Sequence, residues 1–139
     1  MPVFQKTFRI DTKGRCDVVD ITPRVEEIVL ESQIREGIAN VAGRGSTLGI
    51  TTIEYEPGAV SDLQRALEKI APSDAEYAHN ARWGDHNGYA HLRSALVGTT
   101  STFPVRSGAL MVGTWQQVVL CDFDDRSRTR EITVTVFGE

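Results

Sequence analysis

Apolar and polar residues alternate with a period of two through the last third of the chain, and this alternation leaves few folds open to it. A period of two is typical of strands that bury one face of a sheet. The alternation predicts four successive strands, at about 101–106, 109–112, 114–123 and 129–137. The polar residues 124–127 join the last two. Such a run predicts an antiparallel meander.

The first two thirds of the chain mix strand signals with helix signals. Residues 3–10 predict a strand, and residues 11–14 predict a turn into a return strand over 16–21. Two further short strands are expected over 38–41 and 49–55. Helices must therefore connect short strands in this part of the chain.

About three helices are expected. Thr22-Pro23 indicates a helix start because threonine caps free backbone amides and proline is tolerated at the first helical position, and Gly37 is expected to end this helix. A second helix is expected from Ser61 to Pro72, and a third from Tyr89 to Val97. The order of elements predicts an α+β fold with a mostly antiparallel sheet, in a single domain over residues 1–139.

The composition excludes several functional classes. With 40% hydrophobic residues, 24% charged residues and a net charge of −4, the chain resembles an ordinary globular protein and does not favour nucleic-acid binding. No apolar run approaches the ~20 residues of a membrane span, and the N-terminal residues form no apolar signal core. Cys16 and Cys121 are too few for a disulfide framework. We therefore expect a cytoplasmic protein with reduced thiols and no membrane partner.

All three histidines fall between residues 79 and 91. His79, His86 and His91 are interspersed with Asp85 and Asn87, and imidazole, carboxylate and amide oxygen are ligands of divalent cations. Asn87 and His91 share one face of the third helix if Asn87 caps it. The stretch indicates either a site for a metal such as zinc or magnesium, or an acid–base site. The alternatives are that Asn87 is only a cap and that the helix histidine is an ordinary hydrogen-bonded group.

A glycine-rich loop at residues 43–47 is a candidate anion site. Its backbone amides and the hydroxyls of Ser46 and Thr47 suit a phosphate or a carboxylate. The loop lacks the lysine and the following helix of a Walker motif, so the alternative is a plain turn.

A row of alternating arginines follows near the C-terminus. Arg126, Arg128 and Arg130 project to one side if the segment is extended. They form either an anion-binding face or a solvated row that pairs with the nearby aspartates, which are Asp122, Asp124 and Asp125.

Two further polar residues are candidates because of where the predicted strands place them. Glu54 lies at a strand end beside the turn at Pro57, where it is either a ligand or base, or a solvated edge residue. Gln116 follows Trp115 in a predicted strand, so it points to the opposite side of the sheet and could face a pocket.

These segments resemble the YjbQ-like family, whose members are often labelled secondary thiamine-phosphate synthases. The match runs nearly from end to end, and its ordered motifs are the segments 45–58, 77–79, 87–92 and 113–116. The resemblance implies a small α+β domain that assembles as a homotrimer, with a polar cleft near the subunit boundary and a bound divalent metal. The implied activity joins a pyrimidine-methyl diphosphate to a thiazole phosphate and releases pyrophosphate.

The resemblance and the residue patterns together give three sets of candidate residues. The candidate catalytic residues are His91, Glu54 and Gln116. The candidate metal ligands are His79, His91 and Asp85. The candidate residues for a small anionic, phosphorylated ligand are Gly45, Ser46, Thr47, Asn87 and Arg130.

The chain departs from the commonest pattern of the family at Gly45, where a histidine usually stands. A metal site would then lack one histidine and recruit Glu54, Asp85 or water, whereas glycine makes the loop a better backbone cradle for an anion. The usual Asp-Asn pair reads His86-Asn87 here, with Asp85 one place earlier. Two alternatives to an enzyme therefore stay open, a binding module without turnover and a structural trimer.

Overall fold

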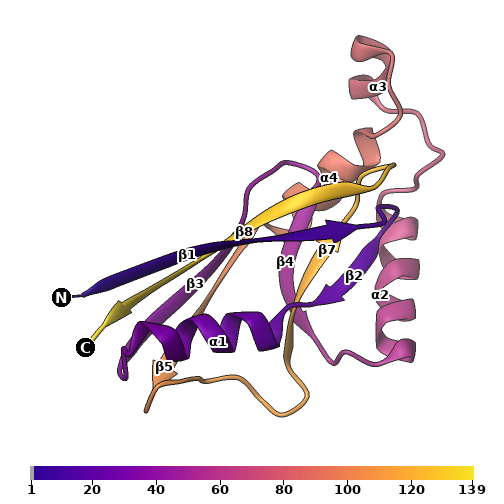
Figure 1. The fold of residues 1–139 in the computed structure, drawn as a ribbon. Helices are drawn as coiled ribbons and strands as arrows, with labels where there is room; N and C mark the ends of the chain where they lie inside the picture. Colours follow the sequence, from indigo (N-terminus) through magenta and orange to yellow (C-terminus); the bar gives the residue numbers. More distant parts are fainter. Residues whose placement is uncertain (1) are drawn as a thin grey trace.

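The chain forms two antiparallel sheets with helices packed against them (Figure 1). The structure is a computed structural model that describes residues 2–139. The five-stranded sheet has the order β1 (Val3–Thr12), β8 (Arg128–Gly138), β3 (Gly37–Gly43), β5 (Thr100–Arg106) and β6 (Ala109–Leu110). The three-stranded sheet has the order β2 (Asp17–Asp20), β7 (Gln117–Asp122) and β4 (Leu48–Ile53). The predicted α+β class with mostly antiparallel pairing is confirmed.

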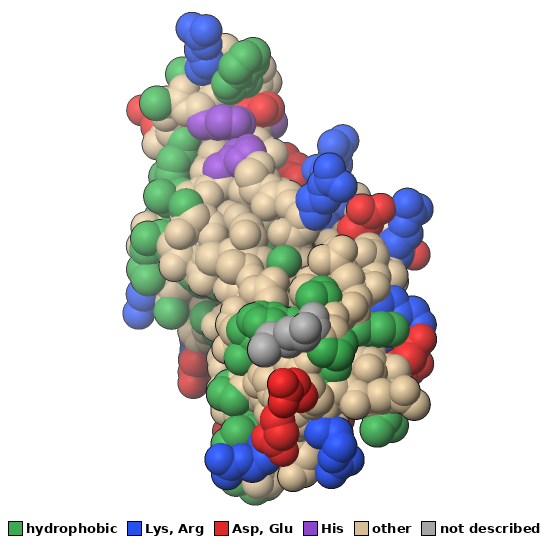
Figure 2. All heavy atoms as spheres, turned by 90° about the vertical axis from the view of Figure 1, so that its left-hand side faces the viewer, with side chains coloured by type: hydrophobic (Ala, Val, Ile, Leu, Met, Phe, Trp, Pro, Cys, Tyr) green, Lys and Arg blue, Asp and Glu red, His purple; other side chains and the backbone are tan. Residues whose placement is uncertain are grey.

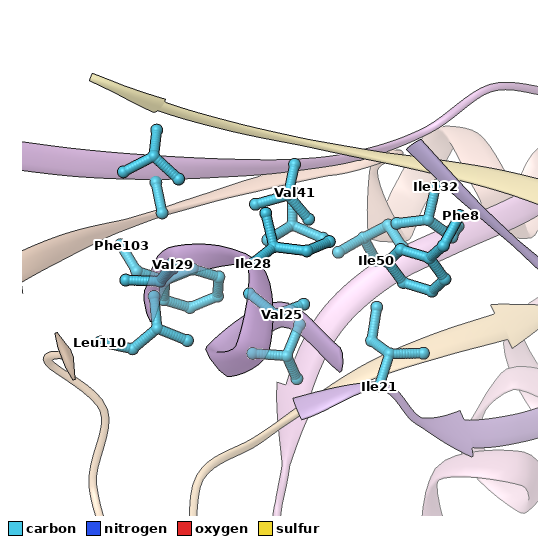
Figure 3. Packing of buried hydrophobic residues seen from close by; sticks show 14 of the residues in the cluster. Phe8, Ile21, Val25, Ile28, Val29, Val41, Ile50, Phe103, Leu110 and Ile132 are labelled. Atoms are coloured by element: carbon cyan, nitrogen blue, oxygen red, sulfur yellow. The ribbon is translucent and has the colours of Figure 1, made fainter. Parts of the chain in front are cut away.

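The main apolar core lies between the two sheets and is closed by helix α1 (Thr22–Ser32). Val25, Ile28 and Val29 of α1 pack there against strand residues such as Val41 and Ile132 (Figure 3). The helical spacing of these apolar positions puts them on one face of α1, as the sequence predicts.

A second, smaller core covers the other face of the three-stranded sheet. It joins β2 and β7 to helices α2 (Pro57–Ile70) and α4 (Gly88–Val97). Strand β7 serves both cores because its side chains alternate: Val118 and Leu120 face the main core, whereas Val119 and Cys121 face the second. The three-stranded sheet is therefore buried on both faces, and α4, which carries His91, is fixed directly against it.

The first two strands do not form the expected hairpin. β1 pairs with β8 along its whole length, from Val3 opposite Phe137 to Thr12 opposite Arg128, whereas β2 pairs with β7 in the other sheet. The cause is a turn in which Gly14, Arg15 and Cys16 all have positive φ, at 76°, 54° and 62°. A Cβ on Gly14 would lie 2.3 Å from the carbonyl oxygen of Arg126, so only glycine fits there.

The C-terminal strands do not form a meander. Of the successive pairs among β5, β6, β7 and β8, only β5 and β6 are hydrogen-bonded to each other within residues 2–139, and β8 lies between β1 and β3. The predicted strand over 114–123 begins only at Gln117, because Gln116 donates its backbone N–H to Gly113 and closes a turn. The alternation predicted strands correctly but not their partners.

The helices differ from expectation at three points. α1 ends at Ser32, where Gln33 adopts a left-handed conformation, and Gly37 instead begins β3. α2 begins at Pro57 rather than Ser61, because the Glu56 side chain accepts the first free backbone amides. A fourth helix, α3 (Ala78–Trp83), has no buried residue and so left no apolar pattern to detect.

Within residues 2–139, no helix is both long enough and apolar enough to cross a bilayer.

Candidate functional site

Two of the three histidines meet beside the loop between α3 and α4. The rings of His79, on α3, and His91, on α4, have centroids 4.5 Å apart and are tilted by 41°. Asp85, in the connecting loop, places Oδ1 3.1 Å from Nδ1 of His79. The histidine side chains lie together on the surface near one end of the molecule, where a stripe of hydrophobic side chains adjoins them (Figure 2). The predicted grouping of His79, His91 and Asp85 is therefore present.

Asn87 precedes α4 as predicted, but its side chain does not cap the helix. The amide of Gly88 is instead satisfied by Oδ1 of Asn80, at 2.8 Å. The Asn87 side chain turns away from the helix and donates through Nδ2 to Oδ1 of Asp124, at 3.4 Å. Sequence reasoning missed Asn80, and its position next to His79 was the only available signal.

Two buried oxygens in this cluster have no hydrogen-bond donor among residues 2–139, although the Asp85 side chain as a whole is 46% exposed. They are Oδ1 of Asp85 and Oδ1 of Asn87, and the contact between Asp85 and His79 does not have hydrogen-bond geometry. A buried acceptor without a donor is unusual, because leaving it unpaired costs about 1–3 kcal/mol. The two oxygens therefore mark a place where a cation or another donor would be favourable.

Arg130 lies in a buried ion pair, with its side chain only 4% exposed. Its Nε and Nη2 atoms each donate to one carboxylate oxygen of Asp122 at 2.7 Å, and Nη2 also donates to Oγ1 of Thr47 at 2.7 Å. Gly45 is adjacent, because a Cβ there would lie 3.1 Å from Nη1 of Arg130. Three residues of the predicted phosphate set thus come together, but Arg130 and Thr47 already have partners inside the protein.

Asp124 connects this ion pair to the histidine cluster. Its carboxylate accepts from Thr47 at 3.0 Å, from Arg128 at 2.7 Å and from Asn87. Burial alone would raise the pKa of Asp124, but hydrogen bonds, first from the Asp125 backbone and then from Thr47 and Asn87, hold it below its usual value. The predicted pairing of the arginine row with aspartates is present for Arg128 and Arg130, but the row is not solvated throughout, because Arg130 is buried.

These hydrogen bonds predict that acid will destabilise the protein through Asp124. A carboxylate whose pKa is lowered by folding stabilises the folded state above its unfolded pKa of ~3.9, and this contribution is lost as the pH falls further. In urea unfolding across that range, Asp124→Asn should show a shallower fall in unfolding free energy below about pH 4 than the wild type. Asp74→Asn, at an exposed site, is the control. If the unfolding free energy falls equally steeply below about pH 4 in Asp124→Asn and in the wild type, the stabilising role of the Asp124 carboxylate is refuted.

The other predicted residues lie apart from this cluster. Glu54 is exposed and follows β4, whereas Thr47 precedes it, so the strand separates them by about 20 Å. Gln116 lies at the Glu54 end, where its Nε2 donates to Oγ1 of Thr52 at 3.3 Å. Ser46 is exposed in the loop beside Thr47. Within one chain, the candidate residues therefore form two groups at opposite ends of β4.

The donor set fits a divalent cation only in part. Two imidazoles, one carboxylate and one amide oxygen lie in the histidine cluster, and the two unpaired oxygens belong to it. Across residues 2–139, however, no three His, Cys, Asp or Glu side chains converge closely enough to hold a metal ion. A cation bound here would need a further ligand from water, from a substrate or from a second subunit.

The comparisons with known proteins identify the family. The family described as UPF0047 protein YjbQ-like matches residues 6–139. This chain belongs to the YjbQ-like UPF0047 family. The predicted resemblance is therefore confirmed.

Relatives of the YjbQ-like family align with the chain over nearly its whole length. A UPF0047 protein of Methanothermobacter thermautotrophicus is 39% identical over 139 residues, which cover 100% of this chain and 95% of the relative. The UPF0047 protein YugU of Bacillus subtilis is 33% identical over 96% of this chain and 98% of its own. The crystal structure of a YbjQ-like protein of unknown function from Sulfolobus solfataricus matches with a TM-score of 0.95, at 34% identity and 99% coverage of both chains.

Proposed function

We propose that this YjbQ-like protein binds a small phosphorylated ligand together with a divalent metal ion at the cluster of His79, His91, Asp85 and Asn87. The observation that carries the proposal is the pair of buried oxygens on Asp85 and Asn87, which lie beside two imidazoles and lack donors within residues 2–139. A cation such as zinc or magnesium would satisfy those oxygens, and the anionic groups of the ligand would complete its coordination.

The activity that we propose is thiamine-phosphate synthesis from a pyrimidine-methyl diphosphate and a thiazole phosphate. A divalent cation, when bound, would neutralise the charge that develops on the departing diphosphate. His91 is the proposed acid–base residue, because its ring nitrogens have no hydrogen-bond partner among residues 2–139. The backbone of the loop at Gly45 and Ser46 is exposed and free to contact a phosphate.

We further propose that the protein acts as a homotrimer in the cytoplasm, with each site completed by a neighbouring subunit. Glu54 and Gln116 lie at one end of β4, whereas Asp124 and Asn87 connect the other end, at Thr47, to the histidine cluster. Large apolar side chains near the histidines are exposed, with Trp83 at 68%, Leu96 at 59% and Leu92 at 41%. Such a surface favours burial against a second copy, which could carry Glu54 and Gln116 to the cluster.

Metal analysis of the purified, untagged protein tests the proposal first. We expect close to one divalent metal ion per chain in the wild type, and loss of the metal in His91→Ala, because two-imidazole sites rarely survive removal of one ring. His86→Ala is the matched control: it removes an exposed histidine of the same stretch and should retain the metal. If the wild type binds no metal when zinc or magnesium is supplied in excess, the metal site is refuted.

Turnover separates an enzyme from a binding module. In an assay with the two phosphorylated substrates, His91→Ala should lower the rate at least about 100-fold, whether His91 acts by holding the metal or by transferring a proton. If the wild type shows no turnover and His91→Ala binds the thiazole phosphate more weakly, the protein is a binding module and not an enzyme. The exposed leucines of α4 are also compatible with a structural trimer that binds no ligand. In that case His79→Ala changes the oligomeric state and the melting temperature, and adding ligand has no effect on either.

A further inference from the structure

A cavity of about 590 Å³ lies on the other side of α4 from the histidine cluster. Its walls come from α2, from α4 and from the turn between β1 and β2. Its charged and titratable lining residues are Arg15, Cys16, Glu68, His86, Tyr89, Arg93 and Asp125. This volume is within the range of small-molecule sites, which is roughly 300–1,000 Å³.

The cavity is separate from the proposed metal site. Tyr89 and Arg93 are four residues apart on α4, as are Asn87 and His91, and the two pairs are offset by two residues. Two residues correspond to about 200° around a helix, so the pairs lie on opposite faces of α4. One face carries the imidazole of the first site, and the other carries a guanidinium and a phenol in the cavity wall.

Arg93 brings a buried positive charge to the cavity. Its side chain is 3% exposed, and it is held by Glu68 at 2.7 Å and by the carbonyl oxygen of Ala71. The guanidinium also lies over the Tyr89 ring, 4.9 Å from its centroid. These hydrogen bonds use Nε and Nη2, and the guanidinium also approaches the thiol of Cys16, where it opposes the rise in pKa that burial causes. A guanidinium fixed in a cavity wall is suited to an anionic ligand.

The rim of the cavity adds a second cation. Arg15 makes no ion pair within residues 2–139, and its backbone is held in the left-handed region at φ 54° between Gly14 and Cys16. Non-glycine residues held in this region cost of order 1–3 kcal/mol each and are concentrated at ligand sites. The turn is fixed by the bond from the Arg15 amide to the carbonyl oxygen of Asp124, at 2.7 Å. The strained turn therefore places the Arg15 side chain at the opening.

The cavity also contains an acceptor. Asp125 lines it, and burial together with the neighbouring Asp124 carboxylate raises the pKa of Asp125. Asp124 accepts a hydrogen bond from Asn87 on one side of α4, whereas Asp125 lines the cavity on the other side. A ligand bound between Arg93, Arg15 and Asp125 would meet two guanidinium groups and two carboxylates, of which Glu68 is already paired with Arg93.

We propose that this cavity is a second ligand site, which takes a small polar molecule with an anionic head group and a hydrogen-bond donor. The anionic group is held by the guanidinium groups of Arg93 and Arg15, and the donor faces Asp125. Carboxylates and phosphates share this chemistry. The site does not depend on the metal site or on the proposed synthase activity.

A titration followed by amide NMR tests this site, with inorganic phosphate in one arm and acetate in the other. We expect saturable shifts of Arg15, Cys16, Tyr89 and Arg93, and the tighter of the two arms identifies the class of head group. Arg15→Gln should weaken binding about tenfold, since it removes a charge-assisted contact and leaves the backbone preference similar. Arg126→Gln, at an exposed arginine outside the cavity, is the matched control and should bind like the wild type.

Two results would overturn the proposal. One is the absence of saturable shifts at the cavity in both arms, and the other is equal affinity in Arg15→Gln and the wild type. Shifts at the cavity that persist in His91→Ala support a separate site even if that variant has lost its metal. Shifts centred on His79 and His91 instead would assign the anion to the first site and overturn the second.

Thiol protection gives a measurement on the wild type itself. Cys16 lines the cavity, and burial raises the pKa of both thiols, that of Cys121 to about 12, so Cys121 is an internal reference. The better-binding anion should slow modification of Cys16 by a small thiol reagent several-fold and leave Cys121 unreactive. An unchanged rate at Cys16 would overturn the proposal without reliance on any variant.

Discussion

Replacing Asp122 by alanine should lower the free energy of unfolding by about 3–5 kcal/mol, because it leaves the Arg130 charge buried without its partner. Asp122 is fully buried, and both of its carboxylate oxygens accept from Arg130 at 2.7 Å. The same carboxylate accepts from the hydroxyl of Thr12 and from the amide of Asp124. Equilibrium urea unfolding, monitored by circular dichroism, measures the loss.

An exposed ion pair between β1 and β8 is the matched control for Asp122. Glu131, the neighbour of Arg130 on β8, pairs with Arg9 at 2.9 Å while the two side chains are 38% and 72% exposed. Glu131→Ala should therefore cost less than about 1 kcal/mol. If Asp122→Ala costs no more than Glu131→Ala, the buried pair is not an important contributor to stability.

The second large effect is expected from Phe123→Ala, which should also cost about 3–5 kcal/mol by opening a cavity in the second core. Phe123 is fully buried among residues of β7 and α4, and its ring approaches Gly49 of β4 so closely that a Cβ there would lie 3.1 Å away. Because α4 carries His91 on one face and Arg93 on the other, this cavity should also loosen both proposed sites.

Phe137→Ala tests whether burial is the cause. Phe137 also lies at the end of a strand, but it is 40% exposed, so its replacement should cost well under half as much. Urea unfolding of both variants, with hydrogen exchange of the α4 amides, separates global from local effects. Comparable losses for the two phenylalanines would contradict the role assigned to the second core.

The sequence predicted which segments are strands and helices better than it predicted which strands pair with each other. Alternation marks a strand because its period is local, so β7 and β8 were recognised, with β7 starting three residues later than expected. The pairing of β1 with β8 depends on a turn at Arg15 and Cys16, where residues that rarely adopt positive φ do so. The residue types in such a turn do not distinguish a hairpin from a connection between two sheets.

The candidate site was predictable where its residues are close in the sequence. His79, Asp85 and His91 were grouped correctly because one short loop and one helical turn connect them. Glu54 could not be placed against them, since a whole strand intervenes and any contact would need another subunit. The cavity beside Arg93 escaped prediction because α2, α4 and a turn far away in the sequence build it together.

The pairing of β1 with β8 also sets the order in which the chain can fold during synthesis. β8 lies inside its sheet, between β1 and β3, yet it is made after every other strand. Until residues 128–138 have left the ribosome, β1 has no partner and β3 pairs only with β5. The edges of β1 and β3 therefore stay unpaired until β8 has been made, so the five-stranded sheet closes after its other strands have been synthesised.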